Sequence, residues 1–398
     1  MRRVCLDEWK LLGEETSKKL HSNLPPGGWF PALRDLSWNI TELSVLHADL
    51  FLSPHLQSIY ICAAWSWNNT GVPPAILPTL VSIISALPTS SLEQILVDAS
   101  HLKIPWEDFK DSFSSIILRC GSSFTEYDSP VPLSNAALDH LLHLPHLRIW
   151  RIHGPPPTYS TSSFPLVFPP LRELTLGEGA ARGWLPLLGR LEGGVSTAQC
   201  VTPLSKAKEF LEALNIEDVS DINIGASFVS AVRSFRNLVS LYVDVYCCDV
   251  GDRDQCAFEL NNDNVTELVM SLTQLEFLLL GHPCFENTCL TTVACLLPIS
   301  VHCNKLEELE IHFNTTNIVD DFRNILGDPR FQQLRSLPRC PLTCLNVHHM
   351  PLSLHESDLQ IVMEGMLDIF PSLTHCKGLK RGWGELSGKI VDLQEDSE

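Results

Sequence analysis

The sequence predicts an α/β solenoid, a stack of repeats in which each repeat adds one strand to a parallel sheet and one helix beside it. The main observation is a hexapeptide, Leu-x-x-Leu-x-Leu or a close apolar variant, that recurs along the 398 residues with apolar side chains at positions 1, 4 and 6. Successive copies lie roughly 20 to 50 residues apart, a spacing typical of repeat proteins. Helix-like segments separate the copies.

Each copy of the hexapeptide predicts one strand. Positions 4 and 6 share one side of a strand, whereas positions 3, 5 and 7 face the other side. Weaker copies are expected at Phe124, Val195 (VSTAQC), Val219 (VSDINI) and Leu373. The clearest copies, in chain order, are LRDLSW (33–38), LQSIYI (56–61), LEQILV (92–97), LRIWRI (147–152), LRELTL (171–176), LVSLYV (238–243), LEFLLL (275–280), LEELEI (306–311) and LTCLNV (342–347).

Between the strand copies, apolar residues recur at helical spacing. The segment 135–143 follows Ser134, a residue type that caps helix N-termini well. The segment 357–370 is expected to seal the strand LTCLNV, because a solenoid must cover its terminal apolar face. The expected helices are 75–87, 135–143, 205–214, 227–235, 264–272, 291–297, 319–326 and 357–370.

The range of the copies places the solenoid at residues 33–376. Residues 1–32 are expected to form an N-terminal cap or the remnant of an upstream segment. Residues 377–398 are expected to form an acidic C-terminal tail that is disordered from Ile390 onward. The alternative is a compact α/β domain whose buried parallel strands are also rich in leucine. The common phase of the copies favours the solenoid.

The excess of acidic residues indicates which kind of partner the chain would bind. The chain carries 28 Lys and Arg against 47 Asp and Glu, a formal net charge of −19. Such a field repels phosphate backbones and favours basic ligands. We therefore expect a protein partner of basic character and no nucleic acid.

No membrane segment is expected. The uncharged stretch 72–92 contains four prolines, and its proline-free run, 79–87, is far shorter than the roughly 20 residues that a bilayer requires.

Asp7, Glu8 and Lys10 interrupt any signal-peptide core, so a cytoplasmic or nuclear location with reduced cysteines is expected. Cysteines expected in the core are Cys62, Cys120, Cys295 and Cys376.

Three groups of residues are candidates for a chemical site. Gly177, Gly179 and Gly183 form a glycine-rich turn that could hold a nucleotide in an enzyme, although glycine in a repeat turn explains them more simply. The acidic residues of 249–259 lack the spacing of a calcium loop. The His and Cys residues of 282–349 lack paired zinc motifs. We expect no catalytic residue, metal or cofactor, and keep a nucleotide-binding enzyme as an alternative.

The copies resemble the leucine-rich-repeat family. LEELEIHFN carries the family's apolar residues and asparagine at Leu306, Leu309, Ile311 and Asn314. FPALRDLSW, LSNAALDHLLHLPHLRIWRI and FPPLRELTL resemble the divergent fungal proteins in which such repeats follow an F-box. The resemblance implies an irregular leucine-rich-repeat solenoid, a horseshoe with a parallel inner sheet and outer helices. It also implies a substrate-recognition arm for a ubiquitin ligase.

Residues 1–32 contain no F-box-like sequence, so a role as a ubiquitin-ligase adaptor is expected only if an F-box lies upstream. A fragment of a secreted leucine-rich-repeat receptor is a further alternative, because Asn-x-Thr sequons begin at Asn39, Asn68, Asn264 and Asn314.

The expected partner-binding surface is the inner face of the sheet, formed by positions 3, 5 and 7 of the copies. Aromatic residues and arginine often dominate binding energy, and the acidic members suit a basic ligand. The candidates are Asp35, Ser37, Tyr60, Arg151, His153, Glu173, Tyr242, Asp244, Glu308, Glu310, His312, Asn346 and His348.

Overall fold

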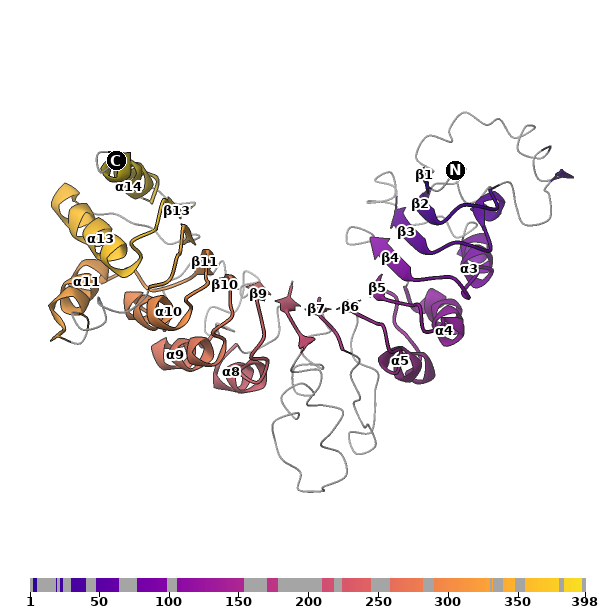
Figure 1. Cartoon of the computed structure of the whole chain (residues 1–398), viewed down its shortest axis with the longest axis horizontal. Coiled ribbons are helices and arrows are strands. Elements are labelled where there is room, and N and C mark those ends of the chain that lie inside the picture. Colours follow the sequence, from indigo (N-terminus) through magenta and orange to yellow (C-terminus); the bar gives the residue numbers. More distant parts are fainter. Residues whose placement is uncertain are drawn as a thin grey trace, which may run out of the picture. The chain divides into compact units, whose positions relative to one another are not determined.

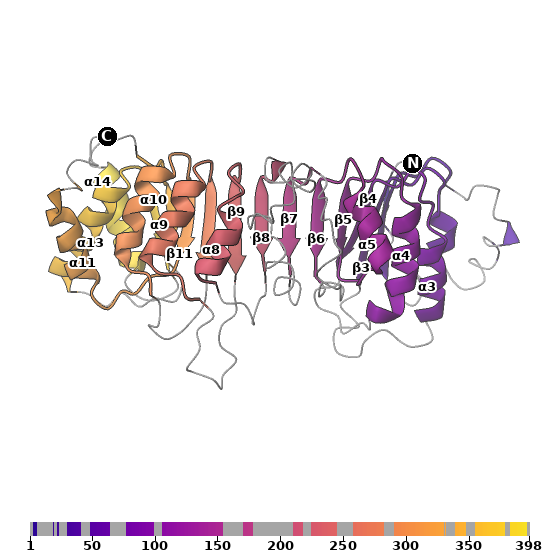
Figure 2. The same ribbon diagram turned by 90° about the horizontal axis from the view of Figure 1, so that it is seen from below.

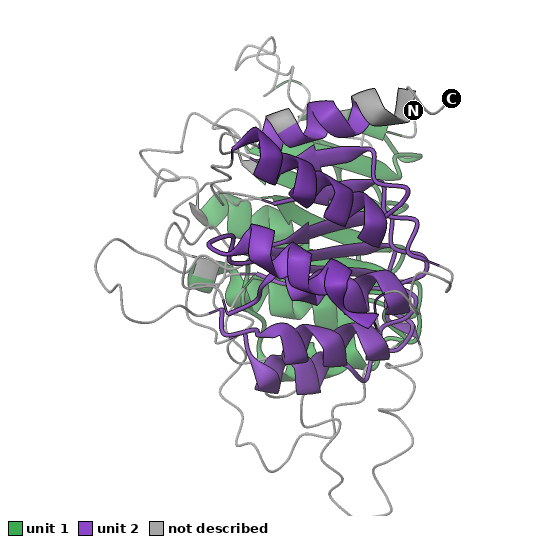
Figure 3. Cartoon of the chain, turned by 90° about the vertical axis from the view of Figure 1, so that its left-hand side faces the viewer, with its two compact units in different colours: residues 1–174, 200–207 green, residues 175–199, 208–398 purple. Residues whose placement is uncertain are grey.

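The computed structural model forms two compact units, unit 1 of residues 1–174 and 200–207 and unit 2 of residues 175–199 and 208–398 (Figure 3). The structure describes residues 3–5, 19, 22–23, 30–40, 48–63, 77–98, 106–153, 170–177, 210–217, 224–244, 258–281, 290–329, 331, 339–347, 355–378 and 383–395.

The described strands form one parallel sheet of thirteen strands whose order follows the chain from β1 to β13 (Figure 1). The α/β solenoid predicted from the sequence, with one strand of a parallel sheet per repeat, is confirmed. The strands are β1 Arg3–Cys5, β2 Asp35–Ile40, β3 Ser58–Ala63, β4 Gln94–Asp98, β5 Glu126–Ser129, β6 Ile149–Ile152, β7 Glu173–Leu176, β8 Ala213–Ile216, β9 Ser240–Asp244, β10 Phe277–Gly281, β11 Glu308–Ile311, β12 Cys344–Asn346 and β13 His375–Lys377.

The apolar positions of the hexapeptide build the core. In register, Leu241 pairs with Leu278 and Leu278 with Leu309, so position 4 of each copy aligns with position 4 of the next. These three side chains are at most 1% exposed. Burying one leucine contributes roughly 1.5–3 kcal/mol, so a row of them stabilises each repeat against its neighbours. The predicted phase of the copies is therefore confirmed.

Helices cover one side of the strands in each unit (Figure 2). In unit 1, Ser134 accepts a hydrogen bond from the backbone N–H of Ala137 and caps α5, as the sequence predicts. In unit 2, Asn261 and Asn264 form a reciprocal capping box at the start of α9. The helices are α3 Leu77–Ser85, α4 Lys110–Arg119, α5 Asn135–Leu142, α8 Ala226–Val232, α9 Asn262–Ser271, α10 Leu296–His302, α11 Ile318–Gly327, α13 Glu356–Ile369 and α14 Trp383–Glu395.

Of the expected helix 205–214, residues 205–209 lie outside the described residues, Phe210 is helical, and the helix does not extend over 211–214. Ala213–Ile216 is strand β8, and Leu211, Leu214 and Ile216 are buried at positions 1, 4 and 6 of an unpredicted copy, LEALNI. Leu, Glu and Ala are strong helix formers, but pairing with β9 overrides that preference.

Of the weak copies of the hexapeptide, the one at Phe124 forms a strand, whereas VSTAQC and VSDINI, expected near β8, are not seen as strands in the described residues. Because β8 pairs directly with β9, VSDINI supplies no strand between them; only its Ile224 lies within the described residues, where it bridges Phe258. VSTAQC lies outside the described residues. The copy at Phe124 is confirmed as β5, with Phe124 fully buried.

The C-terminal end also differs from the expectation. LTCLNV is not the last strand, because β13 pairs with β12 and α14 packs on β13. Ile390 was expected to begin a disordered tail, yet it is fully buried in α14 with Trp383 and Leu386. These three residues repeat at helical spacing, which the acidic composition of the chain end conceals. Ser387 also accepts a hydrogen bond from the backbone N–H of Cys376, at 3.3 Å.

Candidate functional site: the polar face of the sheet

Positions 3, 5 and 7 of the copies form a second side of the strands, which we call the polar face. Figure 1 shows α3–α5 beside β2–β5 and α8–α10 beside β9–β11, each group on a single side. Since side chains alternate along a strand, the residues between the core positions point away from these helices.

Most of the predicted partner-binding residues lie on the polar face and are accessible. Glu308 is exposed, and the half-buried ones are Asp35, Ser37, Tyr60, Arg151, His153, Glu173, Tyr242, Asp244, Glu310 and Asn346. His348 lies outside the described residues. Whether these residues bind a partner stays a prediction.

His312 was wrongly placed on this accessible surface, because it is only 3% exposed. Strand β11 ends at Ile311, and the chain then turns so that Asn314 bridges Thr292. The carbonyl oxygen of His312 accepts a 2.6 Å hydrogen bond from the Thr291 hydroxyl. The regular alternation of the strand therefore does not extend to this residue.

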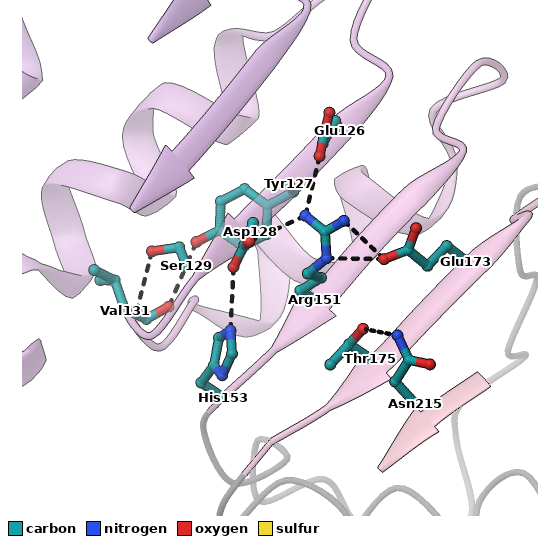
Figure 4. Close-up of polar contacts among 10 residues, drawn as sticks. All are labelled: Glu126, Tyr127, Asp128, Ser129, Val131, Arg151, His153, Glu173, Thr175 and Asn215. Atoms are coloured by element: carbon teal, nitrogen blue, oxygen red, sulfur yellow. Dashed lines mark hydrogen bonds and ion pairs between the residues drawn. The ribbon is translucent and has the colours of Figure 1, made fainter. Parts of the chain in front are cut away.

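The polar face of unit 1 centres on Arg151, which lies among three carboxylates (Figure 4). Its Nη1 is 3.1 Å from Glu126 Oε1 and 3.1 Å from Asp128 Oδ2. Its Nη2 is 2.7 Å and its Nε 2.9 Å from Glu173 Oε1. His153 Nε2 lies 3.1 Å from the other oxygen of Asp128. The register explains the arrangement, since Glu126 and Asp128 of β5 pair with residues of β6.

This cluster keeps a negative excess, because one guanidinium faces three carboxyl groups. Burial raises the pKa of Glu126, and Asp128 and Glu173 raise it further, whereas Arg151 opposes the rise. Burial alone would lower the pKa of Arg151, but Glu173 and Asp128 outweigh it and the pKa is raised. Arg151 therefore remains charged and ties three strands together.

Sequence reasoning missed Glu126 and Asp128, although it found Arg151, His153 and Glu173. Both missed residues occupy positions 3 and 5 of the weak copy at Phe124, so extending the position rule to that copy would have found them. Asp98, at position 7 of LEQILV, was missed as well. It accepts a 2.9 Å hydrogen bond from the Tyr60 hydroxyl. Burial and this contact raise the pKa of Tyr60.

The polar face of unit 2 centres on Tyr242. Its hydroxyl lies 3.4 Å from Asp244 Oδ2. Burial raises the pKa of Tyr242, and the negative charges of Asp244, Glu217 and Glu310 raise it further. Asn346 donates a 2.8 Å hydrogen bond to Glu310 Oε2. Strands β8–β11 contain no Lys or Arg.

The sequence-based candidates for a metal or nucleotide site can be compared with the described residues only in part. It contains no group of three or more His, Cys, Asp or Glu residues that could hold a metal ion. No helix among the described residues is long and apolar enough to cross a membrane. Of the glycine-rich turn, only Gly177 lies within the described residues, and Asp249, Asp252 and Asp254 lie outside them.

Most cysteines of the described segments lie in the core, although Cys62 and Cys344 are half-buried. Cys120, Cys295 and Cys376 are buried as expected, whereas Cys62 is half-buried. Burial raises the pKa of Cys120 to about 12. Cys303 and Cys340 are buried too, and burial raises the pKa of each to about 12. A thiol with such a pKa carries almost no thiolate near neutral pH, so it is a poor nucleophile or metal ligand.

No protein-family profile matches the sequence, and no curated protein matches it. Among solved structures, the crystal structure of the TLR13–ssRNA13 complex is similar, with a TM-score of 0.28 and 14% sequence identity. The match covers 88% of this chain and 55% of that chain, so this chain spans about half the length of the matched one.

Proposed function

We propose that this protein is a protein-interaction module that binds its partner on the polar face of the sheet. The observation that carries the proposal is the arrangement of charged and aromatic side chains on the polar face of each unit. Arg151 and Tyr242 are half-buried. Arg151 donates a hydrogen bond to Glu173 of the neighbouring strand, and the Tyr242 hydroxyl donates one to Asp244 of its own strand. Side chains fixed in this way lose little conformational entropy on binding.

The finer proposal is that the partner is a substrate captured for a ubiquitin ligase, in the cytoplasm or the nucleus. Its support is the resemblance of the repeats to fungal F-box proteins. Under this proposal the chain has no catalytic residue and needs no cofactor. The net charge of −19 favours a basic partner over a nucleic acid.

Photo-crosslinking tests the proposal. A benzophenone amino acid replaces Ser37 or Asn346 on the polar face, and in control variants it replaces Leu118 of α4 or Met270 of α9. Leu118 and Met270 are 46% and 56% exposed, so the control positions are accessible. In cells of the source organism we expect the same protein to be crosslinked from polar-face positions and not from the helices. Adducts formed only from Leu118 or Met270 would place the interaction elsewhere.

A further inference from the structure

The charged side chains around Arg151 include two groups that can take up a proton in weak acid. This Arg151 cluster consists of Glu126 and Asp128 of β5, Arg151 of β6, His153 directly after β6 and Glu173 of β7 (Figure 4). While the imidazole is neutral, three carboxylates and one guanidinium leave the cluster with two negative charges in excess. One proton on Glu126 and one on His153 would cancel this excess.

Asp128 bridges the two basic groups of the cluster. Its Oδ2 lies 3.1 Å from Arg151 Nη1, and its Oδ1 lies 3.1 Å from His153 Nε2. An ionised carboxylate only accepts hydrogen bonds, so the neutral imidazole carries its hydrogen on Nε2 and a further proton goes to Nδ1. The imidazolium then forms an ion pair with Asp128 in the geometry already present. Imidazole is the side-chain group that ordinarily changes charge between about pH 5 and 8.

Glu126 is the second group that takes up a proton. It is only 9% exposed. Burial raises its pKa, Arg151 opposes the rise, and Asp128 and Glu173 add to it. Its register neighbours on β4 and β6 are Gln94 and Ile149, which carry no charge.

The cluster remains accessible to a partner. The side chains of His153 and Asp128 are 34% and 21% exposed, and that of Arg151 is 26% exposed. Among the described residues, Asp128 is the charged group in contact with His153. A change of charge in the cluster therefore changes the field that the polar face of unit 1 presents to solvent.

We propose that the Arg151 cluster makes binding at the polar face of unit 1 dependent on pH, because protons on Glu126 and His153 lower the affinity for a basic partner. This inference rests on the proposed function and adds its regulation. Near neutral pH the two excess negative charges attract a basic protein. In weak acid the excess is cancelled and this attraction is lost. Charges at partly exposed positions interact weakly, so each proton should change the affinity about threefold.

Proton uptake by the full chain tests the first step without a partner. Nuclear magnetic resonance follows the imidazole of His153 and the 13C-labelled side-chain carboxyl of Glu126 from about pH 7.5 to about pH 4.5. The variants His153→Gln and Glu126→Gln assign the two signals. We expect both groups to become protonated within this range while the chain stays folded. In Asp128→Asn, His153 should take up its proton at a lower pH, because the imidazolium loses its ion partner.

The second step is tested with the protein that is crosslinked from Ser37, purified after its identification. Isothermal titration calorimetry measures its Kd at about pH 7.5 and about pH 5.5. The Kd of the wild type should rise roughly tenfold between these values, at about threefold for each proton. The double variant Glu126→Gln with His153→Gln can take up neither proton, so its Kd should change less than about twofold.

A matched control removes a histidine and a glutamate from the helical side of unit 1. His143 follows α5, 3.7 Å from Asp139, and Glu107 is exposed just before α4. His143→Gln with Glu107→Gln should retain the roughly tenfold change of the wild type. A thermal transition that persists at about pH 5.5 shows that the chain is folded in these measurements.

Three results would overturn the inference. Either group could stay unprotonated until the chain unfolds, the wild-type Kd could be independent of pH, or the double variant Glu126→Gln with His153→Gln could change as the wild type does. A loss of affinity that coincides with unfolding would count equally against it. Crosslinks from the helices alone would contradict the proposed function, whereas polar-face crosslinks with a pH-independent Kd would contradict this inference alone.

Discussion

Arg151 links three strands through side-chain contacts, so its removal should destabilise the neighbouring repeats as well as its own. Replacement by Gln leaves Glu126, Asp128 and Glu173 facing one another at partly buried positions. We predict that Arg151→Gln lowers the free energy of unfolding by about 1–2 kcal/mol, between the values of exposed and buried ion pairs. Urea denaturation measures the change. Arg172→Gln, at an exposed position of the next copy, serves as the control, and an equal loss there would remove the special role of Arg151.

Glu126 makes the folding stability of unit 1 depend on pH. Its pKa in the folded state is raised above the ordinary value, so folding takes up a proton between the ordinary pKa, about 4.3, and the raised one. The stabilisation from this proton is complete below the ordinary pKa and is lost as the pH rises through the raised pKa. Gln imitates the protonated form. As the pH rises from about 4 to about 7, the free energy of unfolding of Glu126→Gln should therefore increase relative to that of the wild type, which denaturation at each pH measures. A pH-independent difference would contradict the raised pKa.

The residues of the polar face were predictable where their strands were recognised. Arg151 is position 5 of LRIWRI and Glu173 is position 3 of LRELTL, so counting along these two clear hexapeptides found them. Glu126 and Asp128 follow Phe124, in a copy whose position 6 is Ser129, a buried polar residue. That serine accepts a hydrogen bond from the backbone N–H of Val131, which a pattern of apolar residues does not reveal. The burial of His312 depends on a turn after the strand, and that turn is set by contacts with Thr291 and Thr292.

At the scale of single elements, local preference and tertiary pairing compete. The segment LEALNI favours a helix by its composition, but its 1-4-6 pattern fits the sheet, and strand β8 forms. By contrast, α14 has clear helical spacing in Trp383, Leu386 and Ile390. The sequence contained both signals, and composition concealed them. Helices with strong caps, such as α5 after Ser134, were predicted with nearly correct bounds.

Close packing of α13 on α11 gives a prediction at the scale of these two helices. A Cβ atom at Gly365 would overlap the ring of Phe322, lying 2.9 Å from Cε1. Gly365→Ala should therefore destabilise the protein by about 1–3 kcal/mol, although alanine favours helices. The matched control is Gly388→Ala in α14, where a Cβ would meet nothing within 4 Å. For this variant we expect the free energy of unfolding, measured by thermal denaturation, to rise by roughly 0.5–1 kcal/mol. A gain at both sites would contradict the close contact.

At the scale of the whole chain, the order of the strands in the sheet follows the sequence. Each repeat of a solenoid contacts its neighbours in the chain, so recognising the hexapeptide was enough to predict the parallel sheet and the strand order. The lengths of the connections were not predictable in the same way. The spacing between copies varies because connections of different length follow the strands, and the hexapeptide carries no information about them.

The end of the solenoid provides a prediction about the stability of the entire molecule. Helix α14 covers β13, and Trp383 contacts Phe313 edge to face, with ring centroids 6.4 Å apart. A chain that ends at Lys389 loses the fully buried Ile390 and should unfold at a lower temperature, because burying this side chain contributes roughly 1.5–3 kcal/mol. A chain that ends at Glu395 retains α14 and should melt like the full chain. Differential scanning calorimetry compares them, and identical transitions for all three chains would show that α14 does not cap the repeats.

The claim that the polar face is the binding surface is tested most directly by the affinity for the partner found by crosslinking. Isothermal titration calorimetry compares Tyr60→Ala and Tyr242→Ala, one for each unit, with Leu118→Ala and Met270→Ala on the helices. Aromatic residues at the centre of an interface often cost 2 kcal/mol or more when truncated. At least one tyrosine variant should therefore bind roughly tenfold or more weakly, and both helix variants should bind within about twofold of the wild type. Full affinity in both tyrosine variants, with a loss in a helix variant, would contradict the claim.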